Sequence, residues 1–192
     1  GVDLSGVVEA VGRNVTKFQP GDAVFGGRQG SQAEYVVVTA ERIAKKPANV
    51  SFEEAAGVNM AGRTALQALR DFGNVQPGEK VLINGSSGGV GTYAVQIAKH
   101  LGAEVTGASS GRNTAMVRSL GADRTLDYME QDYTQGSERY DVIVDNVGNH
   151  SIGANRRVLR PNGRYVMVGG EKGRWIKPID RAGGSLPSLA AA

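Results

Sequence analysis

A cluster of glycines follows a short apolar run, and the spacing of these residues suits the binding of a phosphate group. The run at 81–84 predicts a strand, and residues 88–101 predict a helix with one apolar face. Gly88 lets the backbone approach an anion where any Cβ would collide, and Gly91 lets the helix pack closely on the strand. The helix N-terminus adds free N–H groups and the positive end of a dipole. We therefore predict a phosphate site made by Ser87, Gly88, Gly89, Val90 and Gly91.

The position of this glycine loop gives it more weight than a lone fingerprint would have. The loop joins the predicted strand to the helix, and a second strand is predicted next, at 104–108. A strand–helix–strand unit opened by glycines is typical of sites for the pyrophosphate of a dinucleotide. The alternative is a structural turn that binds nothing. That alternative is disfavoured because a plain turn needs fewer glycines.

The end of the second predicted strand indicates which nicotinamide dinucleotide would bind. Sites for NAD usually carry a carboxylate there, about 20 residues beyond the glycines, which binds the ribose 2′-OH. Residues 106–113 contain no carboxylate, but Ser110 and Arg112 offer a hydroxyl and a forked guanidinium that suit a 2′-phosphate. We therefore expect NADPH rather than NADH. The alternative is that Arg112 is a solvated charge at a helix start, where the dipole slightly disfavours a cation.

Two segments, 85–89 and 107–111, also match the Gly-x-Ser-x-Gly pattern of a hydrolase nucleophile. A catalytic triad needs, in addition, an acid and then a histidine at separate strand ends. The chain has 2 histidines, His100 and His150, and His150 follows Asp145 too closely for the two to come from separate loops. A serine hydrolase is therefore a remote alternative.

The hydrophobic pattern of the first part of the chain is typical of a small β barrel or sandwich. Gly and Pro bound three short strands, which are predicted at 6–12, 22–26 and 33–40. Ser51 and Glu54 form a capping box, which predicts the start of a helix. That helix should continue to Leu69, with interruptions near Gly57 and Gly62.

From Lys80 onward, apolar strands alternate with helices. After the glycine-loop unit, a helix is predicted at 114–120, and strands are predicted at 124–127, 141–145 and 165–168. This alternation indicates an α/β fold with a parallel sheet buried on both faces. The expected divisions are a β-rich domain with a bridging helix, a dinucleotide-binding domain and a disordered tail, at 1–75, 76–175 and 176–192.

The composition argues against several other classes of protein. The chain has no cysteine, which excludes disulfides, thiolate nucleophiles and cysteine-ligated zinc. The net charge is +3, but the basic residues are scattered and not interleaved with aromatics, so we expect no nucleic-acid partner. No apolar run approaches the roughly 18 residues of a membrane span, and no signal peptide is evident. A cytoplasmic protein with no membrane partner is therefore expected.

Short motifs occur at 1–12, 18–24, 33–35, 64–69, 88–91 with 94–98, 120–123 and 145–148. In this order and spacing they resemble the medium-chain dehydrogenase/reductase superfamily, and the motifs at 64–69, 88–91 and 94–98 resemble in particular its quinone oxidoreductase branch. The resemblance covers residues 1 to about 175. It implies a partial GroES-like β barrel followed by a Rossmann domain. Family members extend further at both ends, so the chain is expected to be a fragment.

The chain departs from the family pattern at three positions. Ser86 stands where the family has the first glycine of its fingerprint, as is common in the quinone oxidoreductase branch. Val2 and Met60 stand where zinc-dependent members have a His and a Cys. Neither Val nor Met is a usual zinc ligand. The resemblance therefore implies a zinc-independent member with no metal site.

The resemblance also implies roles for further residues around a nicotinamide cofactor. Tyr128 would complete the 2′-phosphate pocket, and Thr64 would contact the carboxamide side of the nicotinamide. The ring would lie against Val147, Gly169 and Gly170, which come from two strand ends, and Asn146 would also bind the cofactor. Asn59 and Arg63 lie near Thr64 in sequence, and they are candidate catalytic donors. For these two, exposure to solvent is at least as good an interpretation.

These expectations combine into a function. An oxidoreductase of this kind would transfer a hydride from NADPH to a quinone or to an alkene conjugated to a carbonyl. Negative charge would develop on the carbonyl oxygen, where a hydrogen-bond donor helps. The alternative is a chain that binds the cofactor but is catalytically incomplete. Family members often form homodimers, and dimerisation of this chain stays open.

Overall fold

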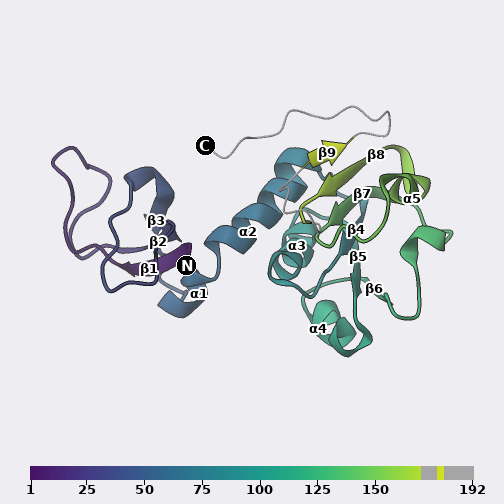
Figure 1. Ribbon diagram of the computed structural model, residues 1–192, viewed down its shortest axis with the longest axis horizontal. Helices are drawn as coiled ribbons and strands as arrows, with labels where there is room; N and C mark the ends of the chain where they lie inside the picture. Colours follow the sequence, from purple (N-terminus) through teal and green to yellow (C-terminus); the bar gives the residue numbers. More distant parts are fainter. Residues whose placement is uncertain (170–176, 180–192) are drawn as a thin grey trace. The chain divides into compact units, whose positions relative to one another are not determined.

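The computed structural model describes residues 1–169 and 177–179, and the chain divides into two compact units (Figure 1). The units are Gly1–Arg63 and Thr64–Ala192. The division falls earlier than the predicted boundary at residue 75. The physical reason is that Ala65, Ala68 and Leu69, on the helix that crosses the division, are fully buried in the core of the second unit.

The first unit contains a small antiparallel sheet in the order β1-β2-β3. Its strands are β1 (Asp3–Val7), β2 (Ala23–Gly27) and β3 (Ile43–Lys45), the last preceded by a short helix, η1 (Ala40–Arg42). The close pairing needs Gly26, because a Cβ there would lie 2.1 Å from the carbonyl oxygen of Arg42. The expected β-rich unit is therefore present.

Two of the three strands predicted in this unit need correction. The prediction at 22–26 agrees with β2, but the first strand lies at 3–7 rather than 6–12. The segment 33–40 is not a strand, and the third strand is β3. Residues 35–38 are strongly β-favouring, but strand structure requires a pairing partner, and the ladder on β2 is formed by 43–45 instead.

The capping box at Ser51 is confirmed, and it begins α1 (Phe52–Ala56). The chain breaks at Gly57, as predicted, and α2 (Asn59–Leu66) then continues into η2 (Gln67–Phe72). Gly62 does not interrupt α2, because its N–H donates to the carbonyl oxygen of Val58 at 2.7 Å and its backbone is buried. At the start of α2, the Asp3 carboxylate accepts the N–H of Met60, a capping contact that links the helix to β1.

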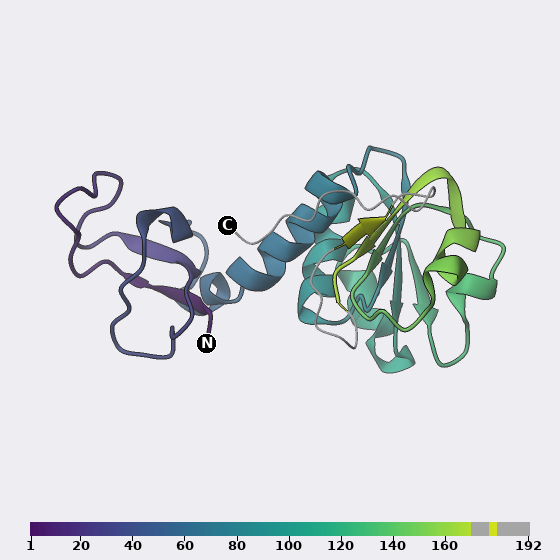
Figure 2. The same cartoon turned by 45° about the horizontal axis from the view of Figure 1, so that its top comes forward.

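The second unit is built on a six-stranded sheet in the order β6-β5-β4-β7-β8-β9 (Figures 1 and 2). Its first five strands are parallel, which confirms the predicted Rossmann-type arrangement, and β9 pairs antiparallel with β8. The strands are β4 (Lys80–Asn84), β5 (Glu104–Ser109), β6 (Arg124–Asp127), β7 (Tyr140–Asp145), β8 (Leu159–Met167) and β9 (Lys177–Ile179). Strand β9 falls within the predicted tail, the rest of which lies outside the described residues.

Helices cover both faces of this sheet (Figure 2). They are α3 (Gly89–His100), η3 (Gly111–Asn113), α4 (Thr114–Ser119), η4 (Tyr133–Gln135) and α5 (Ile152–Arg157). Alternate residues of β4 serve the two sides: Val81 and Ile83 pack with α3, whereas Leu82 packs with the aromatic cluster under η4 and α5. The short helix α5 was absent from the sequence prediction, although Ser151 caps it by accepting the N–H of Ala154.

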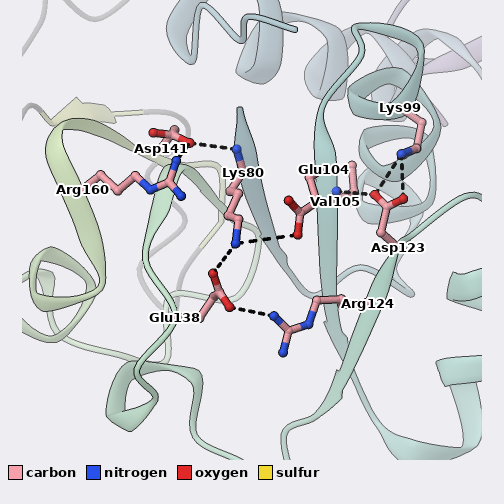
Figure 3. Close-up of polar contacts among 9 residues, drawn as sticks. All are labelled: Lys80, Lys99, Glu104, Val105, Asp123, Arg124, Glu138, Asp141 and Arg160. Atoms are coloured by element: carbon pink, nitrogen blue, oxygen red, sulfur yellow. Dashed lines mark hydrogen bonds and ion pairs between the residues drawn. The ribbon is translucent and has the colours of Figure 1, made fainter. Parts of the chain in front are cut away.

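Charged side chains connect the strands at their amino ends (Figure 3). Lys80 and Arg124 both contact Glu138, each with an N–O distance of 2.6 Å. Arg160 contacts Asp141 at 2.8 Å, and the same carboxylate accepts the backbone N–H of Lys80. The lysine and arginine contacts hold the pKa of Glu138 below its usual value. This edge of the sheet is therefore one in which opposite charges are closely matched.

Candidate functional site

The glycine loop lies at the carboxyl end of β4, where the sheet order switches direction. Strand β4 has β5 on one side and β7 on the other, and ligands of open parallel sheets bind at such a switch point. Gly85 has a φ of +77°, and the N–H groups of Gly85 and Ser86 both donate to the carbonyl oxygen of Ala108. The Ser86 hydroxyl is fully buried and donates to the same oxygen at 2.9 Å. Ser86, which replaces the family's first glycine, thus anchors the loop to β5.

The two glycines to which the sequence analysis gave roles differ in the space around them. A Cβ on Gly91 would lie 2.1 Å from the carbonyl oxygen of Gly85 and 2.7 Å from the Cα of Ser86. A Cβ on Gly88 would meet only the Gly85 oxygen, at 3.5 Å. Gly91 is therefore required for close packing of α3 against the loop, as expected. At Gly88 the space on the side of the missing Cβ is open, which suits a ligand.

Three backbone donors lie at the start of α3. Gly88 is the N-cap, and it makes no side-chain capping bond. In the described part of the chain, the N–H groups of Gly89, Val90 and Gly91 have no hydrogen-bond acceptor. Donors of this kind at a helix N-terminus, combined with the helix dipole, form an anion site. Three of the five predicted phosphate-binding residues thus have an unpaired N–H in the described part of the chain, whereas the N–H of Gly88 donates to the carbonyl oxygen of Gly85.

The residues predicted to hold a 2′-phosphate lie at the ends of two neighbouring strands. Ser110 and Arg112 follow β5, Tyr128 follows β6, and the N–H of Tyr128 donates to the carbonyl oxygen of Ser109. Arg112 is exposed, and Tyr128 is 55% exposed. The parallel pairing of β5 with β6 explains why they share one edge, since parallel strands end together.

Asn113, which the sequence analysis did not single out, links this pocket to the glycine loop. Its Nδ2 donates to the hydroxyl of Ser110 at 3.1 Å and to the hydroxyl of Ser87 at 3.2 Å. Two predicted ligand contacts from different loops are therefore held beside one another. A polar residue in the turn after β5 was visible in the sequence, but its partner on the other loop was not.

A carboxylate that was not predicted from the sequence also lies beside these residues. A Cβ on Gly111 would lie 2.3 Å from Oδ2 of Asp127, so this oxygen packs against the backbone between Ser110 and Arg112. The stretch 106–113 has no carboxylate of its own, as noted, but the fold supplies one from β6. The predicted strand at 124–127 was the available signal, because its last residue must end beside β5 in a parallel sheet.

A second group of polar residues lies at the carboxyl end of β7. Asp145 is fully buried, and its Oδ1 accepts the N–H groups of Val147 and Gly148 at 3.0 and 2.9 Å. Asn84 Nδ2 donates to the same oxygen, and the Tyr165 hydroxyl donates to Oδ2 at 2.7 Å. Burial, followed by the charge of Asp145, raises the pKa of Tyr165, so the phenol stays a donor. These contacts shape the turn that presents Val147, which is 43% exposed.

Asn146 has a buried acceptor without a partner in the described part of the chain. Its N–H and its Nδ2 both donate to the carbonyl oxygen of Asn84, at 3.1 and 3.0 Å. This contact fixes the orientation of the amide and leaves Oδ1 buried with no donor. Gly169 lies beside it, since a Cβ there would be 2.5 Å from the Asn146 carbonyl oxygen. Gly170 lies outside the described residues.

The remaining predicted residues lie on or beside α2. Thr64 is buried in the second unit, whereas Arg63 is exposed and belongs to the first unit. Asn59 is also in the first unit, and its Nδ2 donates to Oδ1 of Asp3 at 2.9 Å. One of the two amide hydrogens of Asn59 therefore already has a partner. The catalytic role predicted for Asn59 and Arg63 stays a prediction.

The serine hydrolase alternative finds no triad in the described residues. Ser87, the serine of the first matching segment, hydrogen-bonds to Asn113 rather than to a histidine. Ser109, the serine of the second, is buried and donates to the backbone of Ser110. The acid beside His150 is Asp132, with 3.8 Å between His150 Nε2 and Asp132 Oδ1, and among the described residues neither of the two hydrogen-bonds to Ser87 or Ser109.

The first unit contains a largely apolar hollow of about 660 Å³. It is lined by β1, by Phe18, Val24 and Ile43, and by the extended segment 33–38. None of the residues predicted to bind the cofactor lines it. The hollow is therefore a feature of the β-rich unit alone.

Comparison with protein families gives two matches. A family model described as alcohol dehydrogenase GroES-like domain matches residues 1–48. A model described as zinc-binding dehydrogenase matches residues 89–182. In the described residues, no three His, Cys, Asp or Glu side chains are grouped so as to hold a metal ion. No helix among them is long and apolar enough to span a bilayer.

Several curated proteins are similar to this chain. A zinc-type alcohol dehydrogenase-like protein of Schizosaccharomyces pombe is 38% identical over 183 residues, which is 89% of this chain and 53% of that protein. The 2-methylene-furan-3-one reductase of Solanum lycopersicum is 34% identical, over 88% of this chain and 46% of that protein. A pikromycin polyketide synthase component of Streptomyces venezuelae is 38% identical, over 88% of this chain but 5% of that much longer protein.

Solved structures of similar proteins share the fold. The CurK enoyl reductase has a TM-score of 0.81 at 32% identity, covering 91% of this chain and 55% of that one. A quinone oxidoreductase from Coxiella burnetii has a TM-score of 0.75 at 36% identity, covering 83% of this chain and 52% of that one. The chain thus spans about half the length of these two structures.

Proposed function

Since the chain belongs to the medium-chain dehydrogenase/reductase superfamily, we propose that it binds NADPH and transfers hydride to a quinone or to an alkene conjugated to a carbonyl. The observation that carries this proposal is the set of unpaired N–H groups of Gly89, Val90 and Gly91 beside the open space at Gly88. The acceptor class is supported by relatives described as quinone oxidoreductases and enoyl reductases.

The residues present fit a nicotinamide dinucleotide in two respects besides the glycine loop. Ser87, Ser110 and Arg112 provide hydroxyl and guanidinium donors at the edge where a 2′-phosphate would bind, and Tyr128 adds a phenol there. Among the described residues, no group donates a hydrogen bond to the buried Oδ1 of Asn146, and an unpaired buried acceptor of this kind calls for an explanation such as a ligand. These features support the set of cofactor-binding residues expected from the sequence, with Val147 and Gly169 beside the ring.

When bound, the nicotinamide supplies the hydride, and the protein supplies binding and orientation. The start of α3 neutralises the pyrophosphate charge through its N–H groups and dipole. The turn after β7, held by Asp145 and Tyr165, presents the apolar Val147 side chain, which limits water at the ring. Thr64 would contact the carboxamide side.

Chemistry without catalytic zinc is part of the proposal. Val2 and Met60 stand at the positions where zinc-dependent members of the family carry their His and Cys zinc ligands. Stabilisation of the developing oxyanion then falls to hydrogen-bond donors. We propose Arg63 and Asn59 for this role, and Arg63 is the stronger candidate because an Nδ2 hydrogen of Asn59 already binds Asp3. Homodimerisation of the whole protein and a cytoplasmic location are also part of the proposal.

The first experiment is a titration of the purified chain with NADPH and with NADH, followed by a panel of quinones and enones. The proposal predicts binding of NADPH and its oxidation when an acceptor is present. Circular dichroism establishes that the chain is folded in the same buffer. A folded chain that binds neither dinucleotide contradicts the proposal. Binding without oxidation by any acceptor supports instead the second candidate, a cofactor-binding but catalytically incomplete chain.

A further inference from the structure

The carboxylate of Asp127 lies among the residues proposed to bind a 2′-phosphate. The Oδ2 atom of Asp127 packs against Gly111, which stands between Ser110 and Arg112. Tyr128 follows Asp127 directly in the chain. The site thus combines phosphate-binding donors with a negative charge. Binding of a 2′-phosphate by the donors does not require that negative charge.

The position of this carboxylate is well determined by its surroundings. Oδ1 accepts the N–H of Met129 at 2.9 Å, and the Asp127 carbonyl oxygen accepts the N–H groups of Glu130 and Gln131. These contacts form a tight turn directly after β6. The side chain is half-buried, so it has little freedom to turn away from Gly111.

Among the residues that the structure describes, Asp127 also lacks the cationic partner that comparable carboxylates have. Asp123, at the other end of β6, contacts Lys99 at 2.8 Å, and Asp141 contacts Arg160 at the same distance. In the described part of the chain, Asp127 forms no ion pair, and Oδ2 receives no hydrogen bond. Within the described residues, no cation therefore compensates its negative charge.

An uncompensated carboxylate at this edge treats the two nicotinamide dinucleotides differently. It repels a 2′-phosphate by direct charge interaction, and it can accept a hydrogen bond from a free ribose 2′-OH. On the basis of the function proposed above, we propose that Asp127 is a cofactor-specificity residue, which weakens NADPH binding and lets the same pocket accept NADH. The donors of Ser110 and Arg112 favour the phosphate, and Asp127 opposes them.

Gly111 is the second part of this arrangement. A side chain at this position would overlap Oδ2 of Asp127, so the glycine is what allows the carboxylate to lie between the two phosphate-binding residues. Gly111→Ala should therefore displace the carboxylate and change cofactor preference in the same direction as its neutralisation.

The test uses Asp127→Asn in the full chain, with dissociation constants for NADPH and NADH measured by calorimetry at one ionic strength. Asparagine is close in size to aspartate, and it keeps an oxygen that can accept the Met129 N–H. We expect the ratio of the NADH dissociation constant to the NADPH dissociation constant to rise about tenfold, because the variant no longer places a negative charge beside the 2′-phosphate. Glu130→Gln is the matched control: it removes the same charge from an exposed side chain three residues away and should leave the ratio within about twofold.

The outcomes separate this inference from the proposed function. A wild-type chain that binds neither dinucleotide contradicts both. A wild-type chain that binds NADPH, with a ratio unchanged in Asp127→Asn or changed equally in Glu130→Gln, overturns the role of Asp127 alone. If Asp127→Asn proves unstable by thermal unfolding, Gly111→Ala provides the second measurement, and an unchanged ratio in that variant counts against the inference.

Discussion

The two ends of the parallel strands in the second unit differ in how completely their polar groups are paired. At the amino ends, Lys80, Arg124 and Glu138 form a connected set of ion pairs (Figure 3). At the carboxyl ends, the N–H groups at the start of α3 and the Oδ1 of Asn146 have no partner in the described residues. Buried polar groups are normally paired within a protein, and exceptions call for an explanation such as a ligand. This difference supports the proposal that a ligand binds at the carboxyl ends, whereas the charges at the amino ends are paired within the protein.

The largest expected effect comes from Gly91→Ala, because this substitution should disturb both the packing of α3 against the glycine loop and the binding of NADPH. The new Cβ would overlap the Gly85 oxygen, and backbone atoms cannot move aside as a flexible side chain can. We expect the free energy of unfolding to fall by about 3 kcal/mol and NADPH binding to be lost. Urea denaturation followed by circular dichroism measures the first effect. An unfolding free energy close to wild type would contradict the packing role of Gly91.

Gly88→Ala should separate binding from stability. The backbone at Gly88 is extended and the protein leaves room for a Cβ, so we expect a stability loss of about 1 kcal/mol or less, the usual size of an N-cap change. NADPH binding should weaken at least about tenfold, because the methyl group occupies the space a phosphate needs. Titration calorimetry beside a denaturation curve tests both statements. Unchanged NADPH affinity would place the phosphate elsewhere.

Tyr165→Phe tests the support beneath the turn after β7. Among the described residues, the Asp145 carboxylate accepts four hydrogen bonds; the variant removes one of them and leaves the donors Asn84, Val147 and Gly148. We expect a stability loss of about 1–2 kcal/mol and a weakening of NADPH binding smaller than that of Gly88→Ala. Tyr133→Phe is the matched control, because its buried hydroxyl bonds to Asn155 instead. Equal effects of the two variants on binding would show that Asp145 does not shape the site.

The smallest effect is expected at the amino ends of the strands. Glu138→Gln removes the contacts with Lys80 and Arg124, which are partly exposed, so the stability loss should be about 1 kcal/mol or less, with no change in NADPH affinity. The hydrogen bond from Lys80, followed by that from Arg124, lowers the pKa of Glu138 from 4.5. A lowered pKa means that this contribution is complete above pH 4.5 and is lost as the pH falls through the lowered value.

The pH dependence provides the check on that prediction. Thermal unfolding of wild type and Glu138→Gln should differ at neutral pH and converge in acid, below the lowered pKa of Glu138. A difference that persists undiminished in acid would mean that the charge of Glu138 is not what stabilises this edge. A changed NADPH affinity would show that the two ends of the strands are energetically coupled.

Much of the second unit was predictable from the sequence because its signals are local. The run at 81–84, the glycines and the amphipathic helix that follows are each encoded by near neighbours, and the structure has β4, the loop and α3 at those places. The predicted strand at 124–127 is β6 without any shift. The same kind of signal failed at 33–40, because a β-favouring segment becomes a strand only where another strand pairs with it.

Only the tertiary structure determines the contacts between segments that are far apart in the chain. The sequence by itself determined that a glycine-rich loop joins a strand to a helix, that Gly91 must be small and that Ser110 and Arg112 follow the second strand. It did not reveal that Asp127 would lie against Gly111, that Asn113 would join the two loops, or that Asp145 would bind Tyr165. Periodicity and turn chemistry act over a few residues. Strand order and register, by contrast, bring side chains together across the sheet, and that placement puts the charge of Asp127 beside Gly111.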